Sequence, residues 1–201
     1  MQKNITFHSG CDAEHALLLR SKLSRDLRRN KLVMIENNKL FIVCPFSCLE
    51  NFLKERYGND IFFLTFSAAV LQYNEFEYLC RVKDFTTREK IKSIYFVNDT
   101  SCRFINGIIN QGHLSGLISE NSIVDLYVEH YFSEFKDKPL FQQQFKMAEL
   151  NIQTQLNEMM NSSLFGSYIK ESAIELKGLI TSKEINASTE IKLNFNNLNC
   201  R

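Results

Sequence analysis

The sequence contains no tryptophan, only two prolines and seven glycines, and four histidines among 201 residues. It has no apolar run near the roughly 20 residues that a membrane helix needs, and no apolar stretch of the signal-peptide kind near Met1. Twenty-four basic and 23 acidic side chains leave a net charge of +1, so no overall field attracts nucleic acid or an anionic membrane. We therefore expect a cytoplasmic protein without a membrane span or a nucleic-acid partner.

Several motifs that identify enzymes are also missing. There is no glycine-rich phosphate loop, no G-x-S-x-G sequence and no metalloprotease signature. The chain has no internal repeat, and its 17 phenylalanines predict a core packed largely with Phe. His113 falls at an expected helix end, where a capping or surface role is commoner than metal binding. His130 lies within the expected helix 121–135, where it can interact favourably with the C-terminal end of that helix.

One segment departs from the even distribution of charge. Residues 17–31 combine basic side chains with leucines at helical spacing. Such a helix can lie on a membrane or bind RNA, but it more often packs its leucines on protein and leaves its charges in water. Because these leucines would have little to cover in a single chain, we expect at least a homodimer.

Three short segments, residues 40–43, 61–64 and 94–97, are apolar throughout, as buried parallel strands are. They alternate with segments of helical spacing, which predicts an α/β fold with a mostly parallel central sheet flanked by helices. The expected strands are 39–44, 60–66, 92–98 and 173–181, with 190–195 as a further candidate, and the expected helices are 12–30, 47–57, 75–83, 101–111, 121–135, 140–160 and 162–170. No linker is apparent, so residues 1–201 are expected to form one domain: a helical arm (1–35), a core (36–182) and a C-terminal strand and tail (183–201).

Two cysteines are placed where a predicted strand meets a helix. Cys44 ends the first apolar run, and Cys102 follows the third, with Asp99 three residues before it. Parallel strands that end together bring such residues to one edge of a sheet. Two thiolates and a third donor can hold zinc. Cys48 either joins them as a fourth ligand or packs as a small apolar side chain on the following helix. The remaining cysteines, Cys11, Cys80 and Cys200, have no companion at ligand spacing and are expected to be ordinary thiols.

The order of these elements and several local sequences resemble the β-class carbonic anhydrases. The clearest stretch runs from Met147 through a helix pair to the strand Ile174-Glu-Leu-Lys-Gly-Leu-Ile. Upstream, Ile61 to Ala69 stands where the family has a strand ending in R-N-A-G-N, and Ile94 to Cys102 stands where it has one ending in G-H-x-x-C-G. The resemblance covers roughly residues 35–182. It implies the fold of that family, a zinc cofactor and an extended dimer in which N-terminal helices clasp the partner subunit.

Transferred one residue at a time, the zinc shell of the family is altered. The two cysteine ligands of the family fall on Cys44 and Cys102, and its histidine ligand falls on Asp99. A shell of two thiolates and a carboxylate carries more negative charge than the family's shell. It would therefore hold the proton of bound water more tightly. In the family motif C-x-D-x-R, the carboxylate and the arginine correspond to Phe46 and Cys48, which can replace neither.

The loop that the family writes R-N-A-G-N also differs, since it is Thr65-Phe66-Ser67-Ala68-Ala69 here. The loss of several such outer partners argues against efficient hydration of CO2. We expect Phe46 and Phe66, beside Thr65, to fill the pocket. Arg103 replaces a family glycine at a helix start, where it either is exposed or binds a small anion such as bicarbonate.

Two functions follow as hypotheses. The sequence favours a carbonic-anhydrase-like pseudoenzyme that has lost efficient CO2 hydration and acts as a binding or structural homo-oligomer. The alternative is a zinc-dependent lyase, namely a slow carbonate dehydratase, or a hydrolase of another small molecule. In that case Cys44, Asp99 and Cys102 hold the metal.

Overall fold

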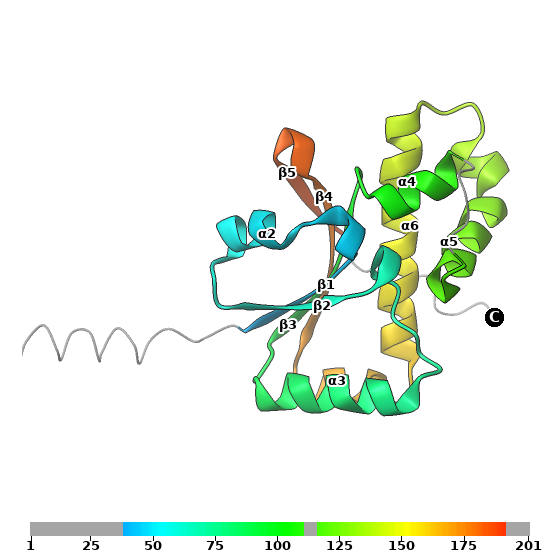
Figure 1. The fold of residues 1–201 in the computed structure, drawn as a ribbon. Coiled ribbons are helices and arrows are strands. Elements are labelled where there is room, and N and C mark those ends of the chain that lie inside the picture. The colour runs from blue at the N-terminus through cyan, green and yellow to red at the C-terminus, as the bar shows by residue number, and fades with distance from the viewer. Residues whose placement is uncertain (1–37, 111–115, 192–201) are drawn as a thin grey trace, which may run out of the picture. The chain divides into compact units, whose positions relative to one another are not determined.

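A computed structural model describes residues 38–110 and 116–191 (Figure 1). The chain divides into two units, residues 1–36 and 37–201, and all the described residues belong to the second. The predicted helix at 12–30, the leucines of 17–31, Cys11, Cys200 and His113 lie outside the described residues. Among the helices of the described residues, none is long and apolar enough to cross a membrane.

A five-stranded sheet forms the centre of the described part and confirms the predicted α/β class. Its spatial order is β2-β1-β3-β4-β5; the first four strands run parallel, and β5 pairs antiparallel with β4. Because the four parallel strands end at one rim, residues that follow β1 and β3 come close together there. The strands are β1 (Lys39–Val43), β2 (Ile61–Thr65), β3 (Ser93–Asp99), β4 (Glu175–Ser182) and β5 (Ala187–Ile191).

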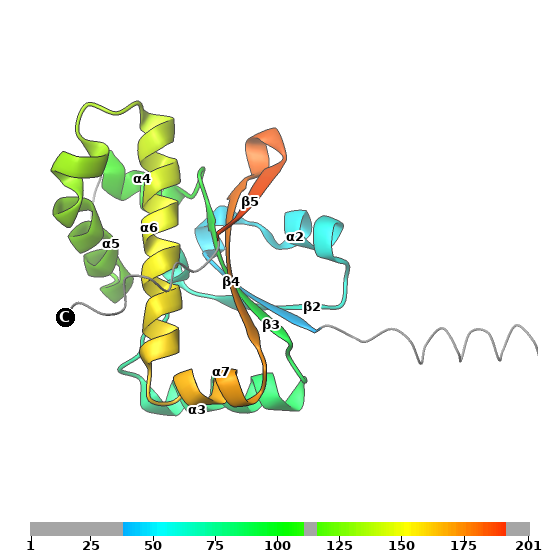
Figure 2. The ribbon, with the colours of Figure 1, turned by 180° about the vertical axis from the view of Figure 1, so that it is seen from behind.

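Helices cover both faces of the sheet, in agreement with the prediction. In views from the front and from behind, α2 and α6 lie on opposite sides of the strands (Figures 1 and 2). The α-helices are α2 (Glu50–Tyr57), α3 (Phe76–Arg88), α4 (Arg103–Ile109), α5 (Ile118–Glu129), α6 (Leu140–Asn161) and α7 (Gly166–Glu171). Short turns of other helix types are η1 (Pro45–Ser47), η2 (Ser67–Ala69), η3 (Tyr131–Phe135) and η4 (Lys183–Ile185).

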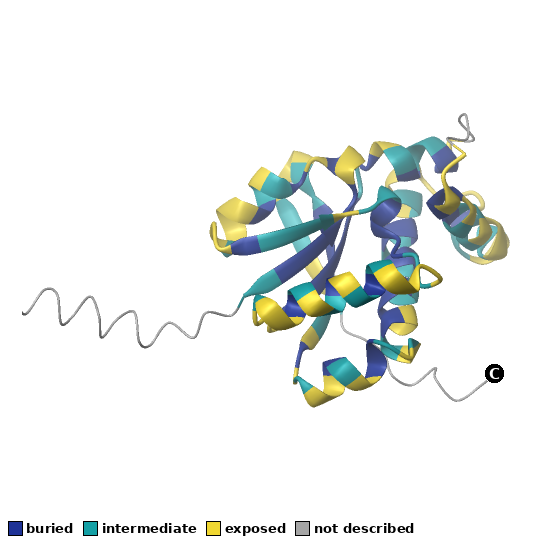
Figure 3. Cartoon of the chain, turned by 60° about the horizontal axis from the view of Figure 1, so that its bottom comes forward, coloured by how far each residue is buried: buried dark blue, intermediate teal, exposed yellow. Residues whose placement is uncertain are grey.

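The strands are buried on both faces because alternate residues point to opposite sides of the sheet. Leu40, Ile42, Ile94 and Phe96 pack with α3, α6 and α7 in one core cluster. Phe41, Val43, Tyr95 and Val97 pack with Leu49 and Leu53 around α2 in another. Figure 3 shows the buried strands in dark blue between helices with exposed outer faces. Continuous apolar runs at 40–43 and 94–97 are therefore required by the architecture.

Several expected elements differ in detail from those of the structure. The helix expected at 47–57 is split into η1 and α2, because Cys48 between them has a left-handed backbone with φ of 50°. Cys48 is exposed, so its packing as an apolar side chain on that helix is wrong. The helix expected at 121–135 is α5 followed by a π-helical turn. The last strand begins at Ala187, not at residue 190, because η4 and the left-handed Asn186 have already reversed the chain.

Candidate functional site

Two buried thiols meet at the rim where β1 and β3 end. Cys44 follows β1 directly, and Cys102 immediately precedes α4. Their relative exposures are 1% and 0%, and both are free cysteines. The two thiols lie close enough to affect each other's pKa. Strand order explains the meeting, because β1 and β3 are adjacent and parallel, with Val43 opposite Val97.

Polar donors surround this pair inside an otherwise apolar cluster. The backbone N–H of Ala68 donates to the Cys44 sulfur over 3.1 Å. The backbone N–H groups of Phe104 and Ile105, in the first turn of α4, contribute to lowering the pKa of Cys102. The buried Ser47 hydroxyl, in η1 between β1 and α2, has no hydrogen-bond partner among the described residues. The backbone amides can stabilise negative charge on sulfur in a place that excludes water.

The interaction between the two thiols shifts their pKa values in opposite directions. The neighbouring Cys44 thiol, acting against the effect of burial, lowers the pKa of Cys102 to about 6. The neighbouring Cys102 thiol, followed in size of effect by burial, raises the pKa of Cys44 above its usual value. Cys102 is therefore the member of the pair that becomes a thiolate first.

Asp99 is buried at the same rim but is bonded to other groups. Its Oδ1 accepts from the backbone N–H of Ser101 at 2.9 Å and from the Ser101 hydroxyl. Its Oδ2 accepts from the Thr181 hydroxyl at 2.6 Å and from the backbone N–H of Lys183 at 3.1 Å. Four donors thus hold the carboxylate against the end of β4.

The alternation of side chains along β3 explains this separation. Asn98 and Asp99 are successive residues of one strand, so they point to opposite faces of the sheet. Asn98 points toward α6, where it bonds to Ala68 and Asn151. Asp99 shares its face with its neighbour in the sheet, Thr181.

The described residues therefore do not assemble the zinc shell that the resemblance implies. In residues 38–110 and 116–191, no three His, Cys, Asp or Glu side chains are close enough to hold a metal ion. Cys48 does not complete a shell, since it is exposed and its thiol lies 3.6 Å from the Pro45 carbonyl oxygen. Zinc binding would need Asp99 to leave its four donors, or a ligand from outside the described residues. The role of Cys44, Asp99 and Cys102 as zinc ligands stays a prediction.

A strained loop beside Cys44 is anchored by buried amides. Ala68 has φ of 56° and ψ of 11°, a left-handed conformation that favours glycine, and it is fully buried. Its carbonyl oxygen accepts from Asn98 Nδ2 at 3.0 Å and from Asn151 Nδ2 at 2.7 Å. The next turn of α6 adds Gln155, whose Oε1 accepts from the backbone N–H of Leu71. Because these contacts fix the loop, they also fix the N–H that Ala68 directs at Cys44.

Sequence reasoning missed these anchoring residues, although one signal was available. Asn151 and Gln155 are four residues apart in a helix whose apolar residues include Ala148 and Ile152. Amides that fall on the buried side of a helix need partners, because an unpaired buried polar group is costly. They therefore indicate a backbone segment that packs across α6.

The residues expected to line or fill the pocket are dispersed. Phe46 is 46% exposed and stacks on Phe104 with ring centroids 5.7 Å apart. Phe66 makes an edge contact with Tyr78 and packs against the cluster of β1, α3 and α6, not against the cluster that holds the thiols. Thr65 and Arg103 are exposed, at the end of β2 and the start of α4. Binding of an anion by Arg103 stays a prediction. His130 is the C-cap of α5, whereas the expected helix continued to residue 135.

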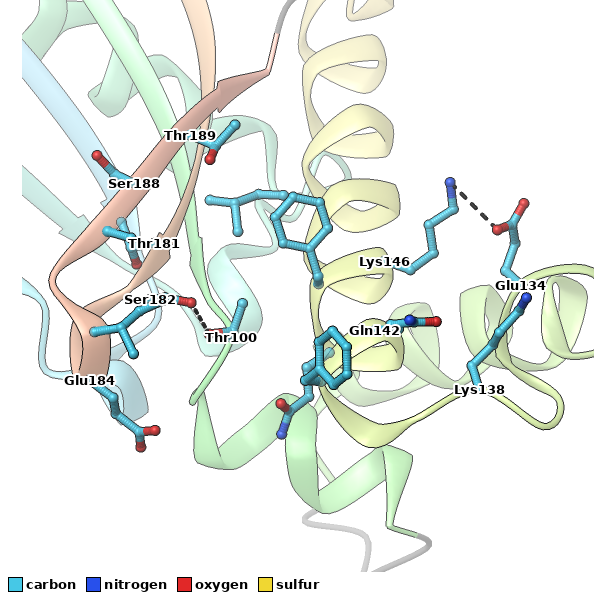
Figure 4. A pocket seen from close by; sticks show the side chains of 16 residues that line it. Thr100, Glu134, Lys138, Gln142, Lys146, Thr181, Ser182, Glu184, Ser188 and Thr189 are labelled. Carbon is cyan, nitrogen blue, oxygen red and sulfur yellow. Dashed lines mark hydrogen bonds and ion pairs between the residues drawn. The ribbon is translucent and has the colours of Figure 1, made fainter.

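A separate groove lies between the first turns of α6 and the β4–β5 hairpin (Figure 4). Its volume is about 770 Å³. Hydroxyl side chains of the hairpin, including Ser188 and Thr189, line one wall, and Lys146, paired with Glu134 at 3.6 Å, lies on the other. Phe141 and Phe145 line it from α6 and are 66% and 42% exposed. Although they share the helical spacing of the core residues, they precede the part of α6 that covers the sheet.

Comparison with known proteins finds similarity in structure. No protein-family model matches the chain, and no curated protein matches its sequence. A β-carbonic anhydrase of the fungal pathogen Aspergillus fumigatus matches with a TM-score of 0.66 and 17% identity, covering 89% of this chain and 90% of that chain. A tetrameric β-carbonic anhydrase of the ascomycete Sordaria macrospora also has a TM-score of 0.66, with 14% identity over 94% of this chain and 98% of that chain. The Coccomyxa β-carbonic anhydrase in complex with acetazolamide has a TM-score of 0.61 and 13% identity over 90% and 87%. At these identities the likeness concerns the fold, so the chain has the fold of the β-carbonic anhydrases.

Proposed function

We propose that this chain is a carbonic-anhydrase-like protein that does not hydrate CO2 efficiently and that serves as a non-catalytic binding or structural homo-oligomer. The observation that carries the proposal is the pairing of the buried Cys44 and Cys102 thiols with each other, without a third ligand among the described residues. A catalytic zinc site uses three protein ligands and an open position for water.

The surroundings of the thiols favour the same conclusion. They share their cluster with isoleucines of α4 and α5, with Phe135 and with Met147. Hydration of CO2 needs a polarised water near a group that can accept its proton. The nearest candidate in the sequence, Asp99, is engaged by four donors instead.

Metal content and catalysis test the proposal directly. The full chain would be purified without added zinc, its metal content measured, and its CO2 hydration followed by stopped-flow. We expect no stoichiometric zinc and no rate above the uncatalysed reaction, with or without zinc in the buffer. Stoichiometric zinc together with hydration that Cys102→Ser abolishes would overturn the proposal. It would instead support the zinc-dependent lyase with Cys44, Asp99 and Cys102 as ligands.

The oligomer is part of the same proposal. Leu140, Phe141, Phe145 and Ile185 are exposed in or beside the groove between α6 and the β4–β5 hairpin. Exposed apolar side chains gathered in one place often mark an interface. A structural neighbour, the Sordaria macrospora enzyme, is tetrameric. We propose that a second copy of this chain covers the groove.

Sedimentation of the wild type and two variants tests this assembly. The wild type should sediment as a dimer or larger species, and Phe145→Lys should shift it toward the 23.5 kDa monomer. Phe132→Lys is the matched control, because Phe132 is 81% exposed and does not line the groove. A wild type that sediments only as a monomer would contradict the proposal. We place the protein in the cytoplasm, where free thiols such as Cys44, Cys48, Cys80 and Cys102 stay reduced.

A further inference from the structure

We propose that a pocket at the C-terminal end of α6 binds a small organic cation, namely a primary amine with an apolar body. The pocket has a volume of about 460 Å³ and lies between the segment that follows η2, residues 70–76, and the last turn of α6. The groove between α6 and the β4–β5 hairpin lies at the other end of this helix. The proposal therefore concerns a second site and does not depend on the proposed function.

Part of the pocket lining can cover an apolar body. The apolar side chains that line it are Val70, Leu71, Phe76, Leu79 and Leu164. Phe76 is 64% exposed, so its ring is available to a ligand, and Tyr73 adds a second aromatic ring. An ammonium group close to the face of an aromatic ring is attracted to it. The volume falls within the range of ligand pockets, which is about 300 to 1,000 Å³.

The charge at the pocket has one sign. Among the described residues that line it, Glu158 is the only charged one, and the other polar side chains are neutral amides and hydroxyls. Arg81 lines a neighbouring hollow that shares only Phe76 with this pocket. The 22-residue helix α6 ends at Asn161, so the negative end of its dipole lies at the same place. A ligand with a positive charge is therefore favoured over a neutral or negative one.

Glu158 is held in position, but its charge is not neutralised. Gln155 is 2% exposed, and its Nε2 donates to Glu158 Oε2 at 2.9 Å, while its Oε1 accepts from the backbone N–H of Leu71 at 2.9 Å. In the described part of the chain, Glu158 forms no ion pair. Burial raises the pKa of Glu158, against the effect of the hydrogen bond from Gln155, as in a carboxylate without a positive partner. A bound ammonium group would supply that partner.

Titration of the full chain with phenethylamine tests the proposal. Isothermal calorimetry would compare this amine with 2-phenylethanol, which has the same apolar body and a hydroxyl in place of the ammonium group. We expect saturable binding of one amine per chain and binding of the alcohol that is weaker by at least about tenfold, because the alcohol lacks the charge-assisted hydrogen bond. Equal affinities for the amine and the alcohol, or no binding of the amine, would overturn the proposal.

Two matched variants assign the effect to one carboxylate. Glu158→Gln should weaken binding of the amine by at least about tenfold and leave binding of the alcohol unchanged. Because Gln can still accept the hydrogen bond from Gln155, its urea denaturation should match that of the wild type. Glu171→Gln removes an exposed carboxylate of α7 that does not line the pocket, so it should bind the amine as the wild type does. A Glu158→Gln protein that binds the amine as tightly as the wild type would overturn the proposal.

NMR spectra of the wild type locate the amine without a variant. The backbone amide signals of residues 70–76 and 158–164 should shift during the titration, with the dissociation constant that calorimetry gives. Ser122→Phe should also weaken binding, because Ser122 lines the pocket from α5 and a larger side chain there fills it while Glu158 stays in place. Shifts confined to residues 141–146, in the groove at the other end of α6, would place the amine elsewhere and overturn the proposal.

Discussion

Cys102 and Asp99 are three residues apart in the sequence and are almost equally buried, yet they have opposite surroundings. Cys102 lies in an apolar cluster, where its main partner is another thiol. Asp99 ends β3, and its side chain turns toward β4, where four donors from Ser101, Thr181 and Lys183 satisfy its oxygens. The comparison shows that closeness along the chain does not make a ligand set. A carboxylate already bonded to four donors is costly to move, and two thiols without a third donor among the described residues do not make a metal site.

The largest expected effect comes from removing the carboxylate. Asp99→Ala should lower the free energy of unfolding by about 4 kcal/mol, because it leaves buried donors of Thr181 and Lys183 without their acceptor. Urea denaturation measures the loss. Asp84→Ala, at an exposed position of α3, is the control and should change stability by less than about 0.5 kcal/mol. A stable Asp99→Ala protein would mean that the carboxylate is free to serve elsewhere, as a zinc ligand would have to be.

The second effect tests the anchor on the thiol side of the comparison. Asn151→Ala removes hydrogen bonds to the Ala68 carbonyl and to Asn98, and it should cost about 2 kcal/mol. It should also loosen the N–H that Ala68 directs at Cys44, so Cys44 should react faster with a thiol reagent. The exposed Gln142, on the same helix, is the matched amide for a control. Equal thiol reactivity in Asn151→Ala and the wild type would show that the loop around Ala68 does not control the reactivity of Cys44.

The third effect concerns the negative charge that Cys102 acquires when its thiol loses a proton. The pKa of Cys102 is lowered to about 6, and it returns to about 9.0 on unfolding. Between pH 6 and pH 9 the unfolded chain therefore binds a proton that the folded chain does not, and stability should rise with pH. The pKa of Cys44 is raised, so stability should fall above pH 9, where the unfolded chain loses a proton that the folded chain keeps.

Urea denaturation at a series of pH values measures both the rise of stability between pH 6 and pH 9 and its fall above pH 9. The rise should be at least about 1.4 kcal/mol, which corresponds to one pKa unit. Thiolate absorbance near 240 nm should appear over the same interval. Cys102→Ser should abolish the rise, and Cys48→Ser should preserve it. A flat profile in the wild type would show that Cys102 keeps its proton in the folded state.

The sequence predicts one side of the comparison better than the other. The apolar runs at 40–43 and 94–97 have to be parallel strands buried on both faces, so the meeting of Cys44 and Cys102 follows from strand order. The place of Asp99 does not follow, because an apolar run does not show which residue ends the strand, and a shift by one residue reverses the face. Asn151 bonds to Ala68, in the loop after β2, and the two residues are 83 positions apart in the chain. Local sequence patterns do not encode a contact over that separation.

The smallest effect tests whether strain is stored beside Cys44. Ala68 and Ala148 are both buried alanines, but Ala68 has φ of 56° and Ala148 is helical. Ala148→Gly should cost about 1 to 2 kcal/mol, because it loses a buried methyl group and adds freedom to the unfolded chain. Ala68→Gly has the same costs, but it also relieves a left-handed alanine worth about 1 to 2 kcal/mol, so its stability should stay close to that of the wild type. Urea denaturation of the two variants gives the difference. Equal losses would mean that Ala68 stores no strain. The loop would then be held in its left-handed form at no cost, and the anchoring amides alone would account for the position of its N–H beside the thiols.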